Sequence, residues 1–312
     1  MLALTSATGK LGSAVLNAIL EHNLIDPKDL VVCTSTTPSS PCLSHLHTHS
    51  LNIRHADYSD PASLRTAYTG CTRLFLVSTP AIAMDYNDAP LWSGREAHHR
   101  AAIDAAVAVG VGHIYYTSLA FSRPSRAGVM RAHIRTEEYL EELQRRGVVE
   151  YTVIRQGLYN ESWPLYFGYY FGLRGEERTE VLVAGDGRVS WTAIADLGFA
   201  TAKVLADRPG MWVGKTVYLS QKETRSLAEI AGLVGEIRGE EVRVRVVGRK
   251  EYEDYYVERM GMERAAVEWW SSTYEALEQG ECAIEDATLE GILSEAGRTP
   301  VSVEVTIREM MK

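Results

Sequence analysis

The sequence predicts an α/β protein built on a Rossmann-type, doubly wound parallel sheet. Three observations support this fold class: a glycine-containing strand–turn–helix stretch at the start of the chain, a regular alternation of expected strands and helices up to residue 155, and a length of 312 residues. Alternating strands and helices are typical of a parallel sheet. A chain of this length suits one large domain or two coupled ones.

The first dozen residues contain the most informative pattern. Residues 2–5 are a short apolar run that predicts a buried strand, and residues 10–22 predict an amphipathic helix. The turn between them reads S-x-x-G-x-x-G from Ser6 to Gly12. Unpaired backbone N–H groups and the dipole at a helix start favour a phosphate there, while Gly9 allows close approach and Gly12 allows tight helix packing. We therefore expect a dinucleotide cradle; the alternative is an ordinary βα turn.

The next elements follow in order to residue 155. Further strands are expected at residues 30–34, 51–54, 73–77, 113–117 and 149–155, with helices at 95–109 and 129–146. Another helix begins with an Asp60 cap and Pro61 in its first turn, buries Leu64, Ala67 and Tyr68, and ends at Gly70. Residues 81–94 are expected to be irregular.

The stretch from residue 34 to 50 is expected to be a loop. It carries histidines at every second position, which could chelate a metal if the stretch were a strand: His45, His47 and His49. Because no cysteine or carboxylate joins them, a solvated loop without metal is the better interpretation.

Composition narrows the function classes. The net charge of −9 argues against a nucleic-acid surface, which needs a concentrated basic face. No apolar run approaches the ~20 residues that span a bilayer. Four cysteines without metal-ligand spacing are typical of reduced thiols. We expect a cytoplasmic protein that binds neither nucleic acid nor membrane.

The chain resembles the NmrA-like branch of the atypical short-chain dehydrogenases, and within it the type 2 quinone oxidoreductases and triphenylmethane reductases. The matching stretches are residues 5–12, 55–58, 106–118, 133–137, 151–159, 184–188, 192–196 and 297–300. The resemblance implies a Rossmann domain over residues 1–157, to which 181–219 return. A smaller α+β substrate domain would then comprise residues 158–180 and 220–312.

The resemblance also implies the cofactor and its ligands. NAD(P)H would be bound by the first turn, the ends of successive strands and one later helix: Ser6, Thr8, Gly9, Lys10, Leu11, Thr34, Ser35, Asp57, Tyr58, Ser78, Thr79, Pro80, Ser118 and His133. Relatives place an arginine for the 2′-phosphate at the position of Ser35, and an NAD site would need an acid there. Hydroxyls accommodate a phosphate better than they replace that acid, so NADP(H) is favoured over NAD(H).

The catalytic residues depart from the family pattern. Short-chain dehydrogenases usually carry a Tyr-x-x-x-Lys pair, and the matching positions here are Val129 and His133. His133 could contact the nicotinamide ribose or supply a proton; the alternative is a structural helix histidine. Tyr159 is the other candidate catalytic residue, and Glu161 is a weaker candidate acid.

The substrate side is rich in aromatic residues. Tyr159 and Trp163 follow the sixth strand at the edge of the sheet where ligands bind, so both are expected to contact a small aromatic or conjugated substrate. Packing between the two lobes is the other explanation for the aromatic residues.

Three functions remain open. The favoured one is an NAD(P)H-dependent reductase that transfers hydride to a quinone-like, enone or imine molecule. The others are a dinucleotide-binding redox sensor without turnover and a cofactor-scaffolded isomerase or cyclase. A missing Tyr-Lys pair weakens ordinary carbonyl reduction but not quinone reduction, because the quinone is already electrophilic.

Overall fold

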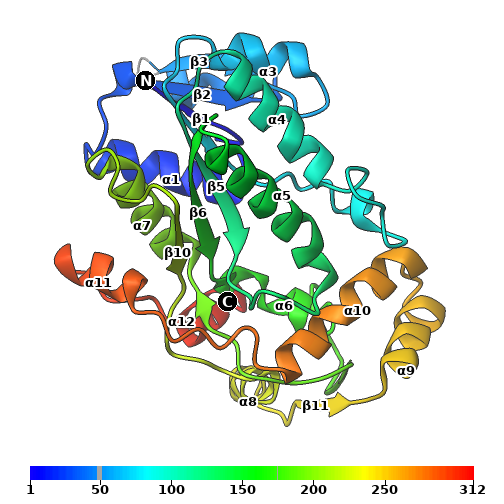
Figure 1. The fold of residues 1–312 in the computed structure, drawn as a ribbon. Helices are drawn as coiled ribbons and strands as arrows, with labels where there is room; N and C mark the ends of the chain where they lie inside the picture. The colour runs from blue at the N-terminus through cyan, green and yellow to red at the C-terminus, as the bar shows by residue number, and fades with distance from the viewer. Residues whose placement is uncertain (48–50, 174) are drawn as a thin grey trace.

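A seven-stranded parallel sheet forms the centre of the molecule (Figure 1). The computed structural model describes residues 1–47, 51–173 and 175–312. The strand order is β10-β6-β5-β4-β1-β2-β3. The strands are β1 (Leu2–Leu4), β2 (Leu30–Thr34), β3 (Asn52–His55), β4 (Arg73–Leu76), β5 (His113–Leu119), β6 (Glu150–Gln156) and β10 (Lys215–Leu219). The chain changes direction across the sheet between β1 and β4, which is the topological switch point of a Rossmann fold. The predicted fold class is confirmed.

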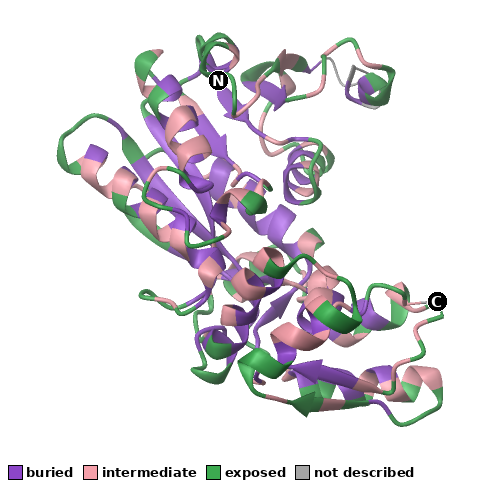
Figure 2. Ribbon diagram, turned by 90° about the vertical axis from the view of Figure 1, so that its right-hand side faces the viewer, coloured by how far each residue is buried: buried purple, intermediate pink, exposed green. Residues whose placement is uncertain are grey.

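Helices cover both faces of this sheet. α1 (Lys10–Glu21) and α7 (Ile194–Ala206) pack on one face, and α3 (Pro61–Tyr68), α4 (Glu96–Ala108) and α5 (Gly128–Arg145) pack on the other. The five inner strands are almost wholly buried between these layers, as Figure 2 shows, whereas the edge strands β3 and β10 are partly exposed. A hydrophobic core on each face of the sheet therefore fixes the position of β1 and of the turn that follows it.

Local signals explain where these elements begin and end. The Asp60 carboxylate accepts a hydrogen bond from the Ala62 N–H (2.9 Å), so it caps α3 as expected. Gly70 follows the helix with φ +80°, a left-handed conformation that favours glycine. The expected strands and helices of this part agree with the structure to within two residues at each end.

One segment differs from the expected loop. Residues 41–47 contain a 3-10 turn (Pro41–Leu43) and the short helix α2 (Ser44–His47), because Pro41 favours the first position of a helical turn. His45 and His47 therefore do not lie in a strand, and His49 lies outside the described residues. Within the described part of the chain, no group of three or more metal-ligating side chains comes together.

The remaining elements form a second mass below the sheet. They include the small parallel pairs β8 (Glu180–Val183) with β11 (Arg243–Val246) and β7 (Leu158–Tyr159) with β9 (Trp191–Thr192). The helices of this region are α6 (Trp163–Tyr166), α8 (Leu227–Arg238), α9 (Arg249–Asp254), α10 (Arg264–Glu278) and α12 (Val303–Met310). α11 (Thr288–Glu295) instead packs against α7 and β10 on the large sheet. β8 lies in the small sheet, whereas α7 and β10 lie on the large one. The proposed domain boundaries stay a prediction.

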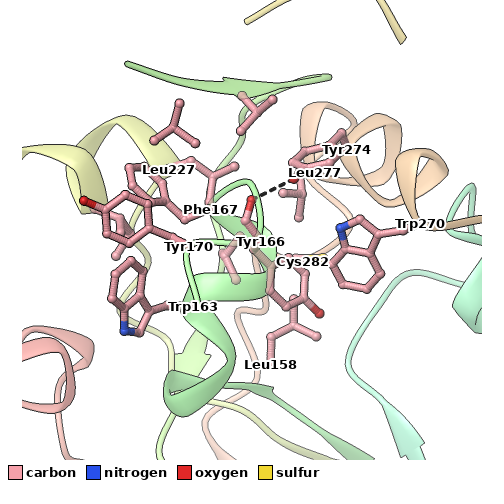
Figure 3. Packing of buried hydrophobic residues seen from close by; sticks show 14 of the residues in the cluster. Leu158, Trp163, Tyr166, Phe167, Tyr170, Leu227, Trp270, Tyr274, Leu277 and Cys282 are labelled. Atoms are coloured by element: carbon pink, nitrogen blue, oxygen red, sulfur yellow. Dashed lines mark hydrogen bonds between the residues drawn. The ribbon is translucent and has the colours of Figure 1, made fainter. Parts of the chain in front are cut away.

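An aromatic core holds this second mass together. Trp163, Phe167 and Tyr170 pack against one another, and the Tyr274 hydroxyl donates to the Tyr166 carbonyl oxygen (2.9 Å), as Figure 3 shows.

No helix among residues 1–47, 51–173 and 175–312 is long and apolar enough to cross a bilayer.

Candidate functional site

The first turn brings its two ends unusually close together. Ser6 adopts a left-handed conformation (φ +49°), and its carbonyl oxygen accepts a hydrogen bond from the Gly9 N–H (2.9 Å). A Cβ atom on Gly12 would lie 2.1 Å from that same Ser6 oxygen, so only glycine lets α1 pack against the turn. The pattern places glycine at the position of Ser6 because the left-handed conformation costs other residues about 1 kcal/mol.

The start of α1 is open toward this turn. Gly9 is extended (φ −80°, ψ 169°), and no side chain of the described residues caps the helix. The first backbone N–H groups of a helix have no partner inside the helix, and its dipole adds partial positive charge there. The turn therefore presents hydrogen-bond donors suited to an anion, which is the geometry expected of a phosphate cradle.

A cavity of about 320 Å³ opens beside this turn, at the carboxyl ends of β1, β2, β3 and β4. It gathers nine of the expected cofactor residues: Ser6, Thr8, Gly9, Thr34, Ser35, Asp57, Tyr58, Thr79 and Pro80. The cavity lies next to the switch point between β1 and β4, the place where open α/β sheets bind ligands.

Tyr58 ties the strand ends at this cavity together. Its hydroxyl donates to the Val77 carbonyl oxygen (2.5 Å) and lies 2.9 Å from Thr5 Oγ1. The Thr5 hydroxyl donates in turn to the Phe75 carbonyl oxygen (3.0 Å) and accepts from the Val77 N–H (2.9 Å). Burial raises the pKa of Tyr58 to about 12, so the phenol stays protonated and the link between β1 and β4 persists at neutral pH.

The charge of the cavity comes mainly from Asp57. Hydrogen bonds from the Ser59 hydroxyl (2.6 Å) and the Ser59 N–H (2.8 Å) lower the pKa of Asp57, which keeps it ionised. Ser35 is exposed at the end of β2, and none of the described residues that line the cavity is a lysine or arginine. A phosphate bound beside Ser35 would thus meet hydroxyls and no cation.

The other expected cofactor residues lie outside this cavity. Lys10 lines a neighbouring cavity of about 450 Å³ between α1 and α7, and Leu11 is buried in the core. The Ser78 N–H donates to Thr117 Oγ1 (2.9 Å). Ser118 is 1% exposed, and its Oγ atom has no hydrogen-bond partner among the described residues.

The structure also adds four lining residues that the sequence did not indicate: Thr5, Ala56, Tyr68 and His98. Tyr68 was expected only as a core residue of α3, yet it lines the cavity, and its buried hydroxyl has no partner among the described residues. His98 Nδ1 lies 3.3 Å from Thr79 Oγ1. For a tyrosine or histidine on a helix, no local sequence signal tells whether the side chain lines a cavity or packs in the core.

His133 is buried, at 1% exposure, and does not line the cavity. Its Nδ1 atom lies 2.8 Å from the Tyr116 hydroxyl. Burial, together with the positive charge of Arg95, lowers the pKa of His133 well below its usual value, so the ring is neutral at pH 7. A neutral imidazole can donate or accept a hydrogen bond, but it is a poor proton donor to a reduced substrate.

The expected substrate residues lie in different surroundings. Tyr159 is partly exposed, packs on the core that contains Ala7 and Leu11 of the first turn, and has a hydroxyl without a partner among the described residues. Burial raises the pKa of this phenol above its usual value. Trp163 is fully buried in the aromatic core, with its ring centroid 5.8 Å from that of Phe167 (Figure 3). Neither Tyr159 nor Trp163 lines the cavity beside the turn.

Glu161 has a structural partner. Both of its carboxylate oxygens accept from the Ile194 N–H at the start of α7 (3.2 Å each). Burial raises the pKa of Glu161, while this backbone hydrogen bond opposes the rise. The carboxylate caps α7, which accounts for its place between Tyr159 and Trp163 without a catalytic role.

A larger cavity, of about 1160 Å³, lies at the opposite edge of the sheet. It is bordered by the amino ends of strands, including Arg73, His113 and Glu150, and by none of the expected site residues. Open α/β sheets bind ligands at the carboxyl ends of their strands. The smaller cavity beside the first turn is thus the better candidate site.

The sheet order and the glycine turn together define a Rossmann-type α/β protein. The model of the NmrA-like family matches residues 1–291, and the chain belongs to that family. The resemblance inferred from the sequence motifs is thereby confirmed.

Curated relatives cover most of the chain. The chain is 29% identical over 314 residues to the NmrA-like family domain-containing oxidoreductase flvB of Aspergillus flavus, which covers 99% of this chain and 94% of the relative. It is also 29% identical over 248 residues to quinone oxidoreductase 2 of Escherichia coli, covering 78% and 76% of the two chains.

Solved structures share the whole fold. The NADPH complex of the NADPH-dependent quinone oxidoreductase QOR2 from Escherichia coli superimposes with a TM-score of 0.81, at 23% identity and full coverage of both chains. The NADP(H) complex of Citrobacter sp. triphenylmethane reductase gives 0.79, at 23% identity, covering 100% of this chain and 99% of the other. At these identities the likeness shows the fold.

Proposed function

We propose that this protein is an NAD(P)H-dependent reductase that transfers hydride to a quinone-like, enone or imine molecule. The observation that carries the proposal is the cavity beside the open start of α1, where nine of the residues expected from the resemblance, from distant parts of the chain, come together at the switch point. The oxidoreductase names of the relatives and the NADPH complexes of the structural neighbours support it.

The residues present fit a dinucleotide. The helix start would hold the pyrophosphate, and the hydroxyls of Thr34 and Ser35 would face the 2′ position of the adenosine ribose. Tyr68 lines the cavity, and its buried hydroxyl, which has no partner among the described residues, is a polar group that a ligand would satisfy. When bound, NAD(P)H supplies the hydride. NADP(H) is the proposed preference, since the hydroxyls beside residue 35 provide no acid for a 2′-hydroxyl.

The chain's own residues suit an acceptor that needs little acid catalysis. His133 is neutral, and the Tyr159 phenol is held protonated by burial, so neither has a pKa near 7. Glu161 is engaged at the start of α7. A quinone or conjugated cation is already electrophilic, and its reduced form can take a proton from solvent. Positioning is then the main contribution of the protein.

A two-part experiment tests this function. Calorimetry with NADPH, NADH and their oxidised forms should show binding, tightest for the phosphorylated cofactors. Steady-state assays should show NADPH consumption with a panel of quinones, enones and triphenylmethane dyes. Binding without reduction of any acceptor would contradict the reductase and support a dinucleotide sensor; absence of binding would contradict both.

A further inference from the structure

Four buried side chains and the backbone N–H of Thr79 form a continuous hydrogen-bonded chain behind the cavity. They come from the loop after β4, from α4, β5 and α5, and each is at most 3% exposed: Thr79, His99, Tyr116, His133 and Thr136. The chain starts at Thr79, which lines the cavity, and ends at His133. Because the members are shielded from water, the direction of each hydrogen bond is set by the neighbouring protein groups.

The backbone of Thr79 fixes the protonation of His99. The Thr79 N–H donates to His99 Nε2 (3.1 Å), and a peptide N–H can only donate. His99 Nε2 therefore carries no hydrogen, and the ring proton is on Nδ1. That atom lies 2.9 Å from Thr136 Oγ1, whose own hydrogen goes to the Ala132 carbonyl oxygen (2.7 Å). His99 is thus a neutral imidazole with a donor at Nδ1.

This arrangement determines the tautomer of His133. The Tyr116 hydroxyl lies 3.2 Å from His99 Nδ1 and 2.8 Å from His133 Nδ1. Since His99 Nδ1 is a donor, the Tyr116 hydrogen is assigned to His133 Nδ1 at 2.8 Å. Thr136 Oγ1, which also interacts with the Tyr116 hydroxyl, already accepts from His99 Nδ1. His133 must then carry its own proton on Nε2. Among the described residues, His133 Nε2 has no hydrogen-bond partner.

The chain orients groups and does not conduct protons. Its far end is the peptide N–H of Thr79, which cannot release a proton at neutral pH, so no proton enters from that side. We infer that Tyr116 is a positioning residue, which holds His133 in the Nε2–H tautomer and thereby presents a hydrogen-bond donor to an oxygen of the bound nucleotide, such as a ribose hydroxyl. The hydrogen bond from His133 to the nucleotide rests on the proposed function. The tautomer of His133 does not, because it follows from contacts within the protein.

Nitrogen-15 spectroscopy of histidine-labelled protein tests the tautomer directly. In the wild type, the two buried rings should show opposite forms, Nδ1–H for His99 and Nε2–H for His133, with each signal assigned by its loss in the His99→Gln or His133→Gln variant. Tyr116→Phe should convert His133 to a tautomer mixture and leave His99 unchanged. Tyr115→Phe is the matched control, because the neighbouring strand residue faces the other side of the sheet.

An Nδ1–H form of His133 in the wild type would overturn the inference, even if Tyr116→Phe did not fold. An unchanged His133 signal in a folded Tyr116→Phe variant would overturn it as well. Neither result depends on the cofactor, so both are separable from a failure of the proposed function.

Cofactor affinity tests the presentation of the donor. Tyr116→Phe should weaken NADPH binding by about 2- to 10-fold, the effect of losing one neutral hydrogen bond. In a His133→Gln background, the amide donates without help from Tyr116, so Tyr116→Phe should have no further effect. Equal losses in both backgrounds would overturn the positioning role. If the wild type bound no dinucleotide, the presentation to the nucleotide would fall with the proposed function, and the tautomer result would stand.

Discussion

Replacing Gly9 with valine should remove cofactor binding while leaving the fold intact. Gly9 is extended (φ −80°, ψ 169°), a conformation that β-branched residues adopt readily. A Cβ atom at this position would lie 3.3 Å from the Ser6 carbonyl oxygen, which needs an adjustment of only a few tenths of an ångström. The side chain would occupy the space in front of the first N–H groups of α1, where a phosphate would sit.

Gly9→Val should change the free energy of unfolding little and the NADPH affinity strongly. Valine is a poorer helix cap than glycine, but it also reduces the entropy of the unfolded chain, so the free energy of unfolding should change by less than about 1 kcal/mol. Loss of one or two charge-assisted hydrogen bonds to phosphate, each ~1.5–3 kcal/mol, should raise the NADPH dissociation constant by at least tenfold.

Gly12→Ala is the contrasting variant. Its Cβ atom would lie 2.1 Å from the Ser6 carbonyl oxygen and 2.7 Å from the Ser6 carbonyl carbon, so it should destabilise the protein by about 1–3 kcal/mol or more. Calorimetry with NADPH and urea unfolding, run on both variants, measure the two quantities. Wild-type NADPH affinity in a folded Gly9→Val protein would refute the assignment of the turn.

Three further predictions concern single side chains. Ser35→Arg should tighten NADPH binding by roughly 10- to 100-fold through a charge-assisted contact and leave NADH nearly unchanged; equal calorimetric effects on both would remove residue 35 from the 2′ position. Burial lowers the pKa of His133, so the unfolded chain binds a proton that the folded chain excludes, and the free energy of unfolding should fall as the pH drops below about 6.5. His133→Gln should reduce that slope by ~1.4 kcal/mol per pH unit in denaturation series, whereas an unchanged slope would show that the ring is protonated in the fold. Tyr159→Phe should lower kcat with a quinone by less than ~100-fold, and a thousandfold loss would instead make the phenol the proton donor.

The sequence predicted the sheet and its first turn well, because their signals are local. The Leu2–Leu4 strand is short and wholly apolar, Asp60 has the geometry of a helix cap, and Gly12 is required by one backbone contact. Each of these features depends on residues close together in the chain.

The surroundings of single side chains were harder to predict. Trp163 follows the sixth strand and was expected at the substrate, but contacts with Phe167 and Tyr170 place it in the aromatic core. Tyr68 shows the converse, since a residue expected only in the core lines the cavity. These outcomes depend on where helices from distant parts of the chain cross, and composition alone does not determine that.

His133 illustrates the same limit within the candidate site. Its spacing from Val129 matches a known pair of positions, but its tautomer depends on Tyr116 and on His99, which come from a strand and a helix elsewhere in the chain. The sequence pattern indicates only that His133 occupies a position of that known pair. Its protonation state follows only from the three-dimensional network.

Transfer of a labelled hydride tests the central claim most directly. NADPH carrying deuterium at both C4 positions of the nicotinamide would be incubated with the protein and either an enone or a triphenylmethane dye, since the carbon reduced in these acceptors does not exchange with water. The account predicts consumption of NADPH in step with acceptor loss, and one deuterium on carbon in each product molecule by mass spectrometry. Tight binding of NADPH with no labelled product from any acceptor would contradict it.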